Sequence, residues 1–399
     1  MDEVLIVGAG PVGLSLALAL ARRGIPARVF EAQPALSQEA RASTLHPPTL
    51  EMLAEWGVAD AVIARGLRVN ALQYWERATR ELIAHFDYAL IAGDTAFPFR
   101  LQCPQSTLTR VLLPAIQATG CAQVHFNHRV VRFRDEGDGV AVTVETPDGE
   151  RIFRGAYLCG ADGAHSLVRR QLGLRFDGMT YADRFLLITT HYDMSTVFPG
   201  LGPVAYIFDP REWVIVMRQR EGVRVIFRVG DDEDAGAALA EDAIRARLRR
   251  LFDPLPADDV PIAGAVLYSV HRRIAEAFHV GRALLLGDAA HINNPTGGMG
   301  MNSGIHDAHA LADRLSRVLR GQPDALLREY AEQRREAALR LVQMRSDQNA
   351  RDLSAADEQA RAERNRRLRQ AAANPDRARI FLLRASMLDA RIPPGEEGA

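Results

Sequence analysis

Glycines and an acid near the start of the chain have the types and spacing of a nucleotide site. Gly8, Gly10 and Gly13 form G-x-G-x-x-G between a short apolar strand and a helix rich in Ala and Leu. In this pattern the first glycine permits a tight turn, the second lets a pyrophosphate approach, and the third allows the helix to pack closely. Glu31 lies eighteen residues after Gly13, at the end of the next strand, where a carboxylate can accept ribose hydroxyls. We therefore expect a site for FAD or NAD, because an acid there disfavours the 2′-phosphate of NADP.

Two further clusters place aspartates after apolar strands. Asp162 and Gly163 follow the strand that begins at Tyr157. Asp162 could equally cap backbone amides in any strand-to-helix turn. Asp288 ends the strand 283–286 and leads into a glycine-rich loop, residues 295–300. The carboxylate there can hold a polyol hydroxyl, and the loop backbone can lie against a flat ring with free N–H groups.

The order of the expected elements indicates a nucleotide-binding fold with an insertion. Residues 3–31 read as strand, helix and strand, which is one βαβ unit. Two strand-rich blocks, residues 72–86 and 185–229, interrupt the elements that carry the clusters. We therefore expect an inserted second domain. Residues 124–133 and 140–146 are predicted to form a hairpin.

The last third of the chain is predicted to be helical from Gly304 onward. Residues 326–373 are dense in Arg, Glu and Ala, and we interpret them as a solvated helix with i,i+4 ion pairs. The tail from Pro393 is expected to fray.

Composition excludes several classes of function. The net charge of −1 gives no general attraction to nucleic acid or an anionic membrane. All 49 basic residues are arginine, so no mechanism can use a lysine. The three cysteines and eleven histidines show no disulfide framework or metal-ligand spacing. With no leader-like start and no apolar stretch long enough to span a membrane, we expect a cytoplasmic protein without a bound metal.

Taken together, the three clusters resemble those of the flavoprotein aromatic hydroxylases, the class A FAD-dependent monooxygenases related to para-hydroxybenzoate hydroxylase and the ubiquinone-pathway hydroxylases. The similarity extends from Val4 to about Arg320. It implies an α/β fold, with a Rossmann-type FAD-binding domain, an inserted mixed or antiparallel β-sheet substrate domain and C-terminal helices. It also implies bound FAD, NAD(P)H and O2 as co-substrates, and a flavin C4a-hydroperoxide that hydroxylates a small phenol-like or fused-ring aromatic substrate.

The expected domain organisation follows the same resemblance. The FAD-binding domain is predicted in three parts, residues 1–70, 99–180 and 273–322. The substrate domain is predicted from the strands 71–98 and the sheet 181–272, and a helical region covers 323–399.

The resemblance also assigns cofactor contacts by position. Gln105 is expected near the ribityl chain, Asp288 on it, and Arg41 near the pyrophosphate. The loop departs from the family pattern P-P-x-G-G-Q-G at Asn294 and Met299, which puts its ring-edge contacts in question. The full expected set is Gly8, Gly10, Pro11, Val12, Gly13, Glu31, Arg41, Gln105, Asp162, Gly163, Asp288, Pro295, Gly298, Gly300, Met301 and Asn302.

No catalytic side chain is assigned, because the flavin would carry the chemistry. Alternation along one strand predicts that Trp213 and Met217 share a face and that Arg218 takes the other. Each is as readily an ordinary sheet residue. Tyr181 and His271 are equally weak candidates, and His291 is interpreted as structural or as close to the loop that would hold the flavin. The candidates for the substrate pocket are His191, Tyr206, Trp213, Met217 and Arg218.

Two other functions fit the same residues. One is an FAD-dependent oxidoreductase of this fold that does not hydroxylate, and the other is a catalytically silent FAD- or ligand-binding protein. A flavin-dependent halogenase is excluded, because that family uses a lysine beside the flavin and a W-x-W-x-I-P signature, which this chain lacks. The sequence leaves open a monomer or a homodimer.

Overall fold

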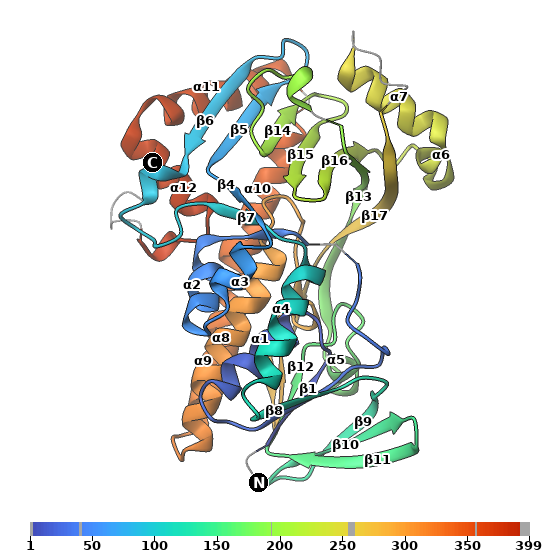
Figure 1. Ribbon diagram of the computed structural model, residues 1–399, viewed down its shortest axis with the longest axis vertical. Coiled ribbons are helices and arrows are strands. Elements are labelled where there is room, and N and C mark those ends of the chain that lie inside the picture. The colour runs from blue at the N-terminus through green and yellow to red at the C-terminus, as the bar shows by residue number, and fades with distance from the viewer. Residues whose placement is uncertain (1–2, 40–41, 193, 254–259, 356, 392–399) are drawn as a thin grey trace.

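The predicted βαβ unit forms at the N-terminus of the computed structural model, which describes residues 3–39, 42–192, 194–253, 260–355 and 357–391 (Figure 1). Strand β1 (Val4–Val7) is fully buried, helix α1 (Pro11–Ala21) follows the glycine turn, and β2 (Ala27–Phe30) pairs with β1 in parallel. Pro11 occupies the first helical turn, where its missing N–H costs nothing. The helix begins two residues earlier than Gly13, where the sequence predicted its start.

A six-stranded sheet gathers strands from distant parts of the chain. Its order is β18-β19-β12-β1-β2-β8, and the strands from β19 to β8 run parallel. Helices α1, α4 and α8 pack beside this sheet (Figure 1). The carboxyl ends of these parallel strands therefore meet along one edge. The bounds are β8 (Ala122–His125), β12 (Tyr157–Gly160), β18 (His279–Val280), β19 (Ala283–Leu285), α4 (Gln105–Gln117) and α8 (Gly300–Leu319).

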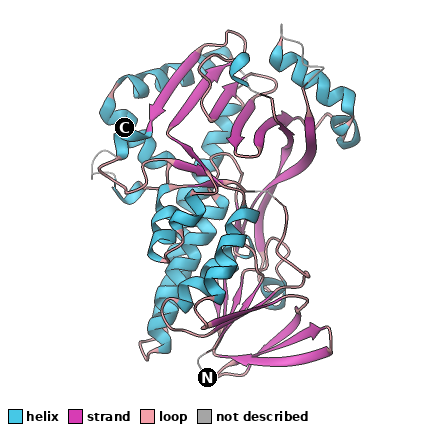
Figure 2. Ribbon diagram, viewed as in Figure 1, coloured by secondary structure: helices cyan, strands magenta, loops and turns pink. Residues whose placement is uncertain are grey.

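An eight-stranded mixed sheet forms the other half of the molecule, in the order β20-β17-β13-β16-β15-β14-β5-β6 (Figure 2). One face packs on the amphipathic helix α7, and the other on the C-terminal helices α11 and α12. This inserted sheet agrees with the expected fold class. Its bounds are β5 (Ala71–Glu76), β6 (Leu82–Asp87), β13 (Phe176–Thr190), β14 (Val204–Phe208), β15 (Val214–Gln219), β16 (Gly222–Val229), β17 (Ile262–Ala275), β20 (His291–Ile292), α6 (Ala235–Leu239), α7 (Glu241–Phe252), α11 (Glu358–Ala373) and α12 (Pro375–Ala385).

Smaller elements connect the two large sheets. Strand β7 (Arg100–Gln102) pairs with β3 (Thr44–Leu45) and β4 (Leu67–Val69) in a short antiparallel sheet between them. None of the helices in the described ranges is both long and apolar enough to cross a membrane. The remaining bounds are α2 (Pro47–Glu55), α3 (Ala59–Ile63), η1 (Tyr88–Ile91), β9 (Arg129–Asp135), β10 (Val140–Thr146), β11 (Gly149–Gly155), α5 (Leu167–Gln171), η2 (Met194–Thr196), η3 (Gly287–Ala289) and η5 (Asp389–Arg391).

The predicted hairpin strand 124–133 was wrong. Its first part belongs to β8 of the six-stranded sheet, and its second part to β9, which pairs with β10 in a separate three-stranded sheet. The break falls at Asn127, whose φ of 55° ends extended backbone. The predicted hairpin therefore exists between β9 and β10, without the residues that belong to β8.

The single solvated helix predicted over 326–373 was also wrong. The chain forms α9 (Ala325–Ala337), a π-helix η4 (Ala338–Gln343), α10 (Met344–Leu353) and then α11. An expected surface pair exists between Arg340 and Glu336, but Tyr330 and Leu353 are buried in the core. These helices therefore pack on both sheets. The tail from Pro393 lies outside the described residues.

The buried carboxylate of Asp307 ties three of these segments together. Asp307 accepts hydrogen bonds from the backbone N–H of Gly287 (3.0 Å), from His291 Nε2 (2.8 Å) and from Arg334 Nε (2.6 Å). Burial alone would raise the pKa of the Asp307 carboxyl, but Arg334 and His291 together hold that pKa well below its usual value. The carboxylate is therefore ionised and joins α8, α9 and the turn after β19. His291 is structural, as predicted.

We predict that Asp307→Asn destabilises the protein by about 3 kcal/mol, because it leaves the largely buried Arg334 without its anion. Since the pKa of Asp307 is depressed, its contribution is present at neutral pH and disappears as the pH falls through the acid range. The variant should therefore lose part of the acid sensitivity of the wild type. Urea unfolding at several pH values measures both effects.

Asp313→Asn is the matched control, because Asp313 lies on the same helix in an exposed i,i+4 pair with Arg317. Its effect should stay within about 0.5 kcal/mol. Equal losses in the two variants would contradict the role given to Asp307.

Candidate functional site

The parallel strands bring the clusters of the sequence to one edge of the six-stranded sheet. Because β1, β2, β12 and β19 are neighbours, the residues that follow them lie side by side. Those residues are Gly8, Glu31, Asp162 and Asp288, which come from widely separated parts of the sequence. The carboxyl edge of a parallel sheet is the common place for a nucleotide in this architecture.

The three glycines of the first turn have different surroundings. At Gly8, whose φ is 100°, a Cβ would lie 2.6 Å from the Ala161 carbonyl oxygen, and at Gly13 it would lie 2.0 Å from that of Gly8. Neither position can accept a side chain. At Gly10 no atom lies within 4 Å of a Cβ position. The middle glycine thus faces open space through which a pyrophosphate can approach the helix terminus.

Glu31 is fixed by backbone amides at this edge. Its Oε2 accepts a hydrogen bond from Ala9 N and its Oε1 one from Gln33 N, both at 2.9 Å. The Ala9 bond orients the carboxylate against the glycine turn. Because a carboxylate has about four acceptor sites, two remain for ribose hydroxyls.

The Asp162 carboxylate caps a helix with one oxygen and keeps the other without a partner among the described residues. Its Oδ2 accepts hydrogen bonds from the backbone N–H groups of Leu167 (2.7 Å) and Val168 (3.1 Å), so the carboxylate caps α5. Its Oδ1 is buried and has no partner among the described residues. A buried acceptor without a donor is costly, which suits a position completed by a ligand. Gly163 follows with a φ of 75°.

The loop after β20 is held by its own polar residues. Asn294 Oδ1 accepts a hydrogen bond from Thr296 N, and the Thr296 hydroxyl lies 2.8 Å from two acceptors, Asn294 Oδ1 and the Ser346 carbonyl oxygen. Asn294, which departs from the family pattern, thus closes a local turn. Gly298, with a φ of 68°, packs so closely that a Cβ would lie 2.8 Å from Thr44 Cβ. Pro295 is exposed at the tip of the loop, and Asp288 is exposed at the end of β19.

Asn302 joins that loop to the start of helix α8. Its Nδ2 donates to the carbonyls of Thr44 (2.8 Å) and Gly298 (2.7 Å), and its Oδ1 accepts from His46 N (2.9 Å). The helix begins at Gly300, so the N–H groups of Gly300, Met301 and Asn302 have no intrahelical acceptors. A helix N-terminus of this kind attracts a partly negative ring edge.

Two expected contacts are less direct. Arg41 lies outside the described residues. Gln105 begins α4, and its side-chain amide donates to the Glu39 carbonyl at 3.2 Å, beside the segment that leads to Arg41. Val12 packs against Gly287 and Gly304, where a Cβ would approach the Val12 side chain to 3.0 and 2.6 Å. The Val12 side chain thus lies between helix α1, the turn η3 and helix α8.

The residues present fit FAD. Open space at Gly10 suits a pyrophosphate, the partnerless Oδ1 of Asp162 suits a hydroxyl donor, and the exposed Asp288 lies between these and the loop 295–300. The turn, the two aspartates and the loop would hold the adenosine, the ribityl chain and the ring in that order.

The substrate candidates separate into two groups. Tyr206, Trp213 and Met217 share the sheet face that packs on α11 and α12, which confirms the predicted alternation. Trp213 Nε1 donates to Ser354 Oγ at 3.1 Å, so this indole anchors the end of α10. His191 and Arg218 are exposed, and we do not include them in the proposed site.

Tyr181 and His271 lie at the irregular pairing of β13 with β17. The Tyr181 hydroxyl donates to Asp347, and the Thr180 hydroxyl lies 2.9 Å from His271 Nδ1. Among the described residues no group of three His, Cys, Asp or Glu side chains could hold a metal ion.

His46, which no motif of the sequence marks, is fully buried beside the loop. Its Nε2 lies 2.9 Å from the Gly297 carbonyl oxygen, and its Nδ1 has no partner among the described residues. Burial, and then the nearby Arg100, hold the pKa of His46 well below its ordinary value, so the ring stays neutral. The Gly297 contact requires the proton on Nε2, which leaves a lone pair on Nδ1.

A buried arginine lies among three tyrosines, and no motif of the sequence marks these residues. We name them the Arg100 cluster (Arg100, Tyr74, Tyr88 and Tyr206). The guanidinium contacts the hydroxyls of Tyr88 and Tyr206 and donates to the Ala385 carbonyl at 2.7 Å. Tyr74 stacks on Tyr206 with ring centroids 5.3 Å apart. Burial alone would lower the pKa of Arg100, but the tyrosines raise it, so the side chain stays charged.

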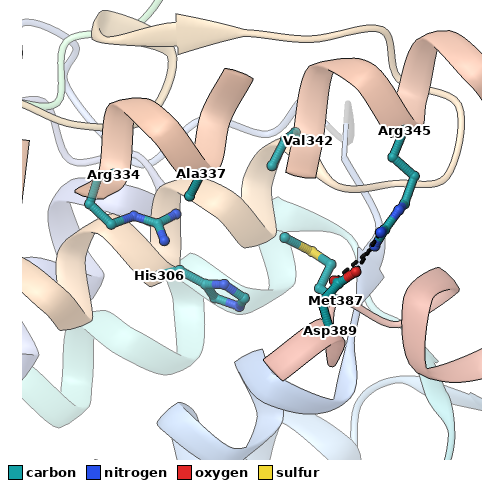
Figure 3. Close-up of a pocket in the computed structure, with 7 residues that line it drawn as sticks. All are labelled: His306, Arg334, Ala337, Val342, Arg345, Met387 and Asp389. Atoms are coloured by element: carbon teal, nitrogen blue, oxygen red, sulfur yellow. Dashed lines mark hydrogen bonds and ion pairs between the residues drawn. The ribbon is translucent and has the colours of Figure 1, made fainter. Parts of the chain in front are cut away.

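A small cavity of about 50 Å³ lies between α8, the π-helix and the segment after α12 (Figure 3). His306 and Met387 point into it, and Arg345 pairs there with Asp389. His306 Nε2 lies 3.1 Å from Thr49 Oγ1, whose hydroxyl also donates to Asn302. Since one water needs about 10–15 Å³, the cavity suits a few waters rather than an aromatic substrate.

Comparison with known proteins gives one family. Residues 1–345 match the model of the FAD binding domain family. The chain is 32% identical over 396 residues to para-nitrophenol 4-monooxygenase of a Pseudomonas strain, covering 98% of this chain and 97% of that protein. It is 33% identical to 6-hydroxy-3-succinoylpyridine 3-monooxygenase of Pseudomonas putida, covering 88% of this chain and 89% of that protein.

Solved structures agree with these relatives. The crystal structure of p-nitrophenol 4-monooxygenase from Pseudomonas putida superposes with a TM-score of 0.90 at 30% identity, covering 98% of this chain and all of that one. A ternary complex of aklavinone-11 hydroxylase with FAD and aklavinone superposes with a TM-score of 0.73 at 31% identity, over 82% of this chain and 65% of that one. The chain belongs to the FAD-dependent aromatic hydroxylases, a family of flavoprotein monooxygenases.

Proposed function

We propose that this protein hydroxylates a small phenol that carries an electron-withdrawing substituent, using FAD, NAD(P)H and O2. The substrate class follows that of relatives named for nitrophenol and pentachlorophenol. The proposed FAD contacts are the residues of the carboxyl edge, the loop 295–300 and the start of α8. A cytoplasmic location, and a monomer or homodimer, stay predictions.

One observation carries this proposal: a tyrosine-lined face of the inserted sheet is joined to the loop that would hold the flavin ring. Gly297 contacts His46, His46 lies beside Arg100, and Arg100 contacts Tyr206 on β14. An aromatic substrate between the loop and this face would therefore lie against the flavin ring and would meet tyrosine hydroxyls.

The flavin, when bound, supplies the redox chemistry by accepting a hydride from NAD(P)H and activating O2. The protein supplies position and electrostatics. Glu31 and Asp288 would hold the ribose and the ribityl chain, and the first turn of α8 would direct N–H groups at the ring edge. Burial raises the pKa values of Tyr74 and Tyr88, so both phenols stay neutral and can donate hydrogen bonds.

The sheet face that carries Tyr206 is largely apolar. Ile215 and Ile226 are buried there beside Tyr206, while Tyr74, Met217 and Tyr268 keep part of their surface accessible. Burial nevertheless raises the pKa of Tyr268 strongly. An apolar face of this kind, placed against the flavin ring, would limit the access of water to a reactive oxygen.

We predict that purified protein with FAD oxidises NADH or NADPH faster when 4-nitrophenol is added, and that the product carries the added oxygen. Mass spectrometry of the product and oxygen consumption measure this, with phenols lacking the nitro group and fused-ring aromatics for comparison. NAD(P)H oxidation without an oxygenated product from any of them would favour the non-hydroxylating oxidoreductase. A flavin that NAD(P)H does not reduce would favour the silent binding protein.

We also predict that Asp288→Ala weakens FAD binding by about 10- to 100-fold, because a charge-assisted hydrogen bond to the ribityl chain is lost. Flavin fluorescence during titration of the apoprotein gives the dissociation constant. Asp231→Ala, at an exposed position on the inserted domain, is the control and should bind FAD like the wild type. Unchanged affinity in Asp288→Ala would remove this residue from the site.

A further inference from the structure

Arg100 differs in its partners from Arg247 and Arg334, two other largely buried arginines of the described chain. Arg247 pairs with Glu212 and Glu233, and Arg334 pairs with Asp307. Arg100 is only 3% exposed, and no carboxylate of the described residues forms an ion pair with it. Its acceptors are one carbonyl and tyrosine hydroxyls. A buried cation that meets only neutral groups is costly, and an anion in the same space would offset that cost.

The guanidinium also has an unused donor. Arg100 Nε is buried and has no partner among the described residues. The nearby Nδ1 of His46 is likewise buried and without a partner. Two unpartnered nitrogens from different segments thus lie in the same neighbourhood, beside the loop residue Gly297 and the sheet residue Tyr206. The Arg100 N–H calls for an acceptor such as an anionic oxygen, whereas the lone pair on His46 Nδ1 can only accept a hydrogen bond, so His46 is not a contact for that anion.

The surroundings select an aromatic anion. Tyr74 stacks on Tyr206, meets Phe381 edge-on at 6.0 Å, and shares an apolar cluster with Ile215 and Ile226. Flat rings and branched side chains favour a flat ligand, and the guanidinium favours a negative oxygen. A phenolate offers both in one small molecule. Its negative oxygen also feeds electrons into the ring, which suits a substrate that is to be attacked by an electrophilic oxygen.

We propose that Arg100 binds the phenolate oxygen of the substrate, with the Tyr206 hydroxyl as a second donor, so that the enzyme selects acidic phenols in their ionised form. This inference rests on the proposed function. No proton is transferred within the site, because a phenol with an electron-withdrawing substituent has already released its proton to water. Neutral aromatics of the same shape should bind more weakly.

The titratable groups nearest Arg100 are neutral, so the negative charge that would balance the guanidinium is expected from a ligand. His46 from the loop before α2 is held neutral by burial and by Arg100 itself. Tyr74 and Tyr206 from the sheet, and Tyr88 from η1, are phenols, and burial raises the pKa values of Tyr74 and Tyr88. More distant groups are Asp352, which acts on Tyr74, and His306, whose pKa burial lowers to about 3.

The test is an optical titration of the FAD-loaded enzyme with 4-nitrophenol, whose phenolate absorbs in the visible range. We expect the bound ligand to ionise about 1–3 pH units below the free ligand, as an acid does beside an arginine. Arg100→Gln should remove this shift and weaken phenolate binding by about 10- to 100-fold. Binding of the neutral analogue 4-nitroanisole should change by less than about threefold.

Arg65→Gln, at an exposed arginine, is the matched control and should keep the wild-type ligand shift. Arg100→Lys keeps the positive charge and should retain most of the shift in ligand ionisation. This variant also provides a test if Arg100→Gln does not fold. A bound ligand that ionises like the free one in the wild type, or a full shift in Arg100→Gln, would overturn the inference.

The two proposals fail separately. Phenolate binding through Arg100 without any oxygenated product would leave this inference standing and remove the proposed hydroxylation. Hydroxylation of neutral aromatics with no preference for the phenolate would do the reverse.

Discussion

The buried carboxylate of Asp307 sets the shape of the cofactor side of the molecule. It holds the Gly287 amide, the His291 ring and the Arg334 guanidinium at once. Gly287 and His291 belong to the segment after β19 and Arg334 belongs to α9, and each donor is fixed in direction in the buried core. The turn that presents Asp288 and the start of α8 therefore keep one relative position, whatever occupies the space before them.

Much of the cofactor side could be predicted from the sequence. Parallel strands align their carboxyl ends, so three clusters that follow such strands are expected at one edge of the sheet. This expectation does not depend on the structure of the roughly 250 residues between them. The glycine pattern was equally informative, since only Gly8 and Gly13 are sterically forced while Gly10 is open. Asp162 shows the limit, because its cap on α5 and its buried free oxygen were both allowed by the sequence and both occur.

The substrate side could not be predicted, because its contacts have no local pattern. His46 contacts Asn302 across 256 positions, and Arg100 contacts Ala385 across 285. Neither residue stands in a recognisable motif, and an arginine at the start of a short strand is normally solvated. The helices after α9 were misjudged for a related reason. Their surfaces are rich in Arg and Glu, but scattered apolar residues such as Leu353 and Leu368 pack on the inserted sheet.

The strand order of the nucleotide sheet also governs how the chain can be made. Strand β1 lies between β2 and β12, and β19 completes the edge only after residue 285. At about 5–20 residues per second, a ribosome delivers that strand on the order of 15–60 s after the first one. During that interval the nascent N-terminal segment has an open, apolar strand edge, which is the kind of surface that chaperones cover. If Asp288 and the loop 295–300 hold the flavin as proposed, its capture would follow their synthesis, late in the biogenesis of this protein.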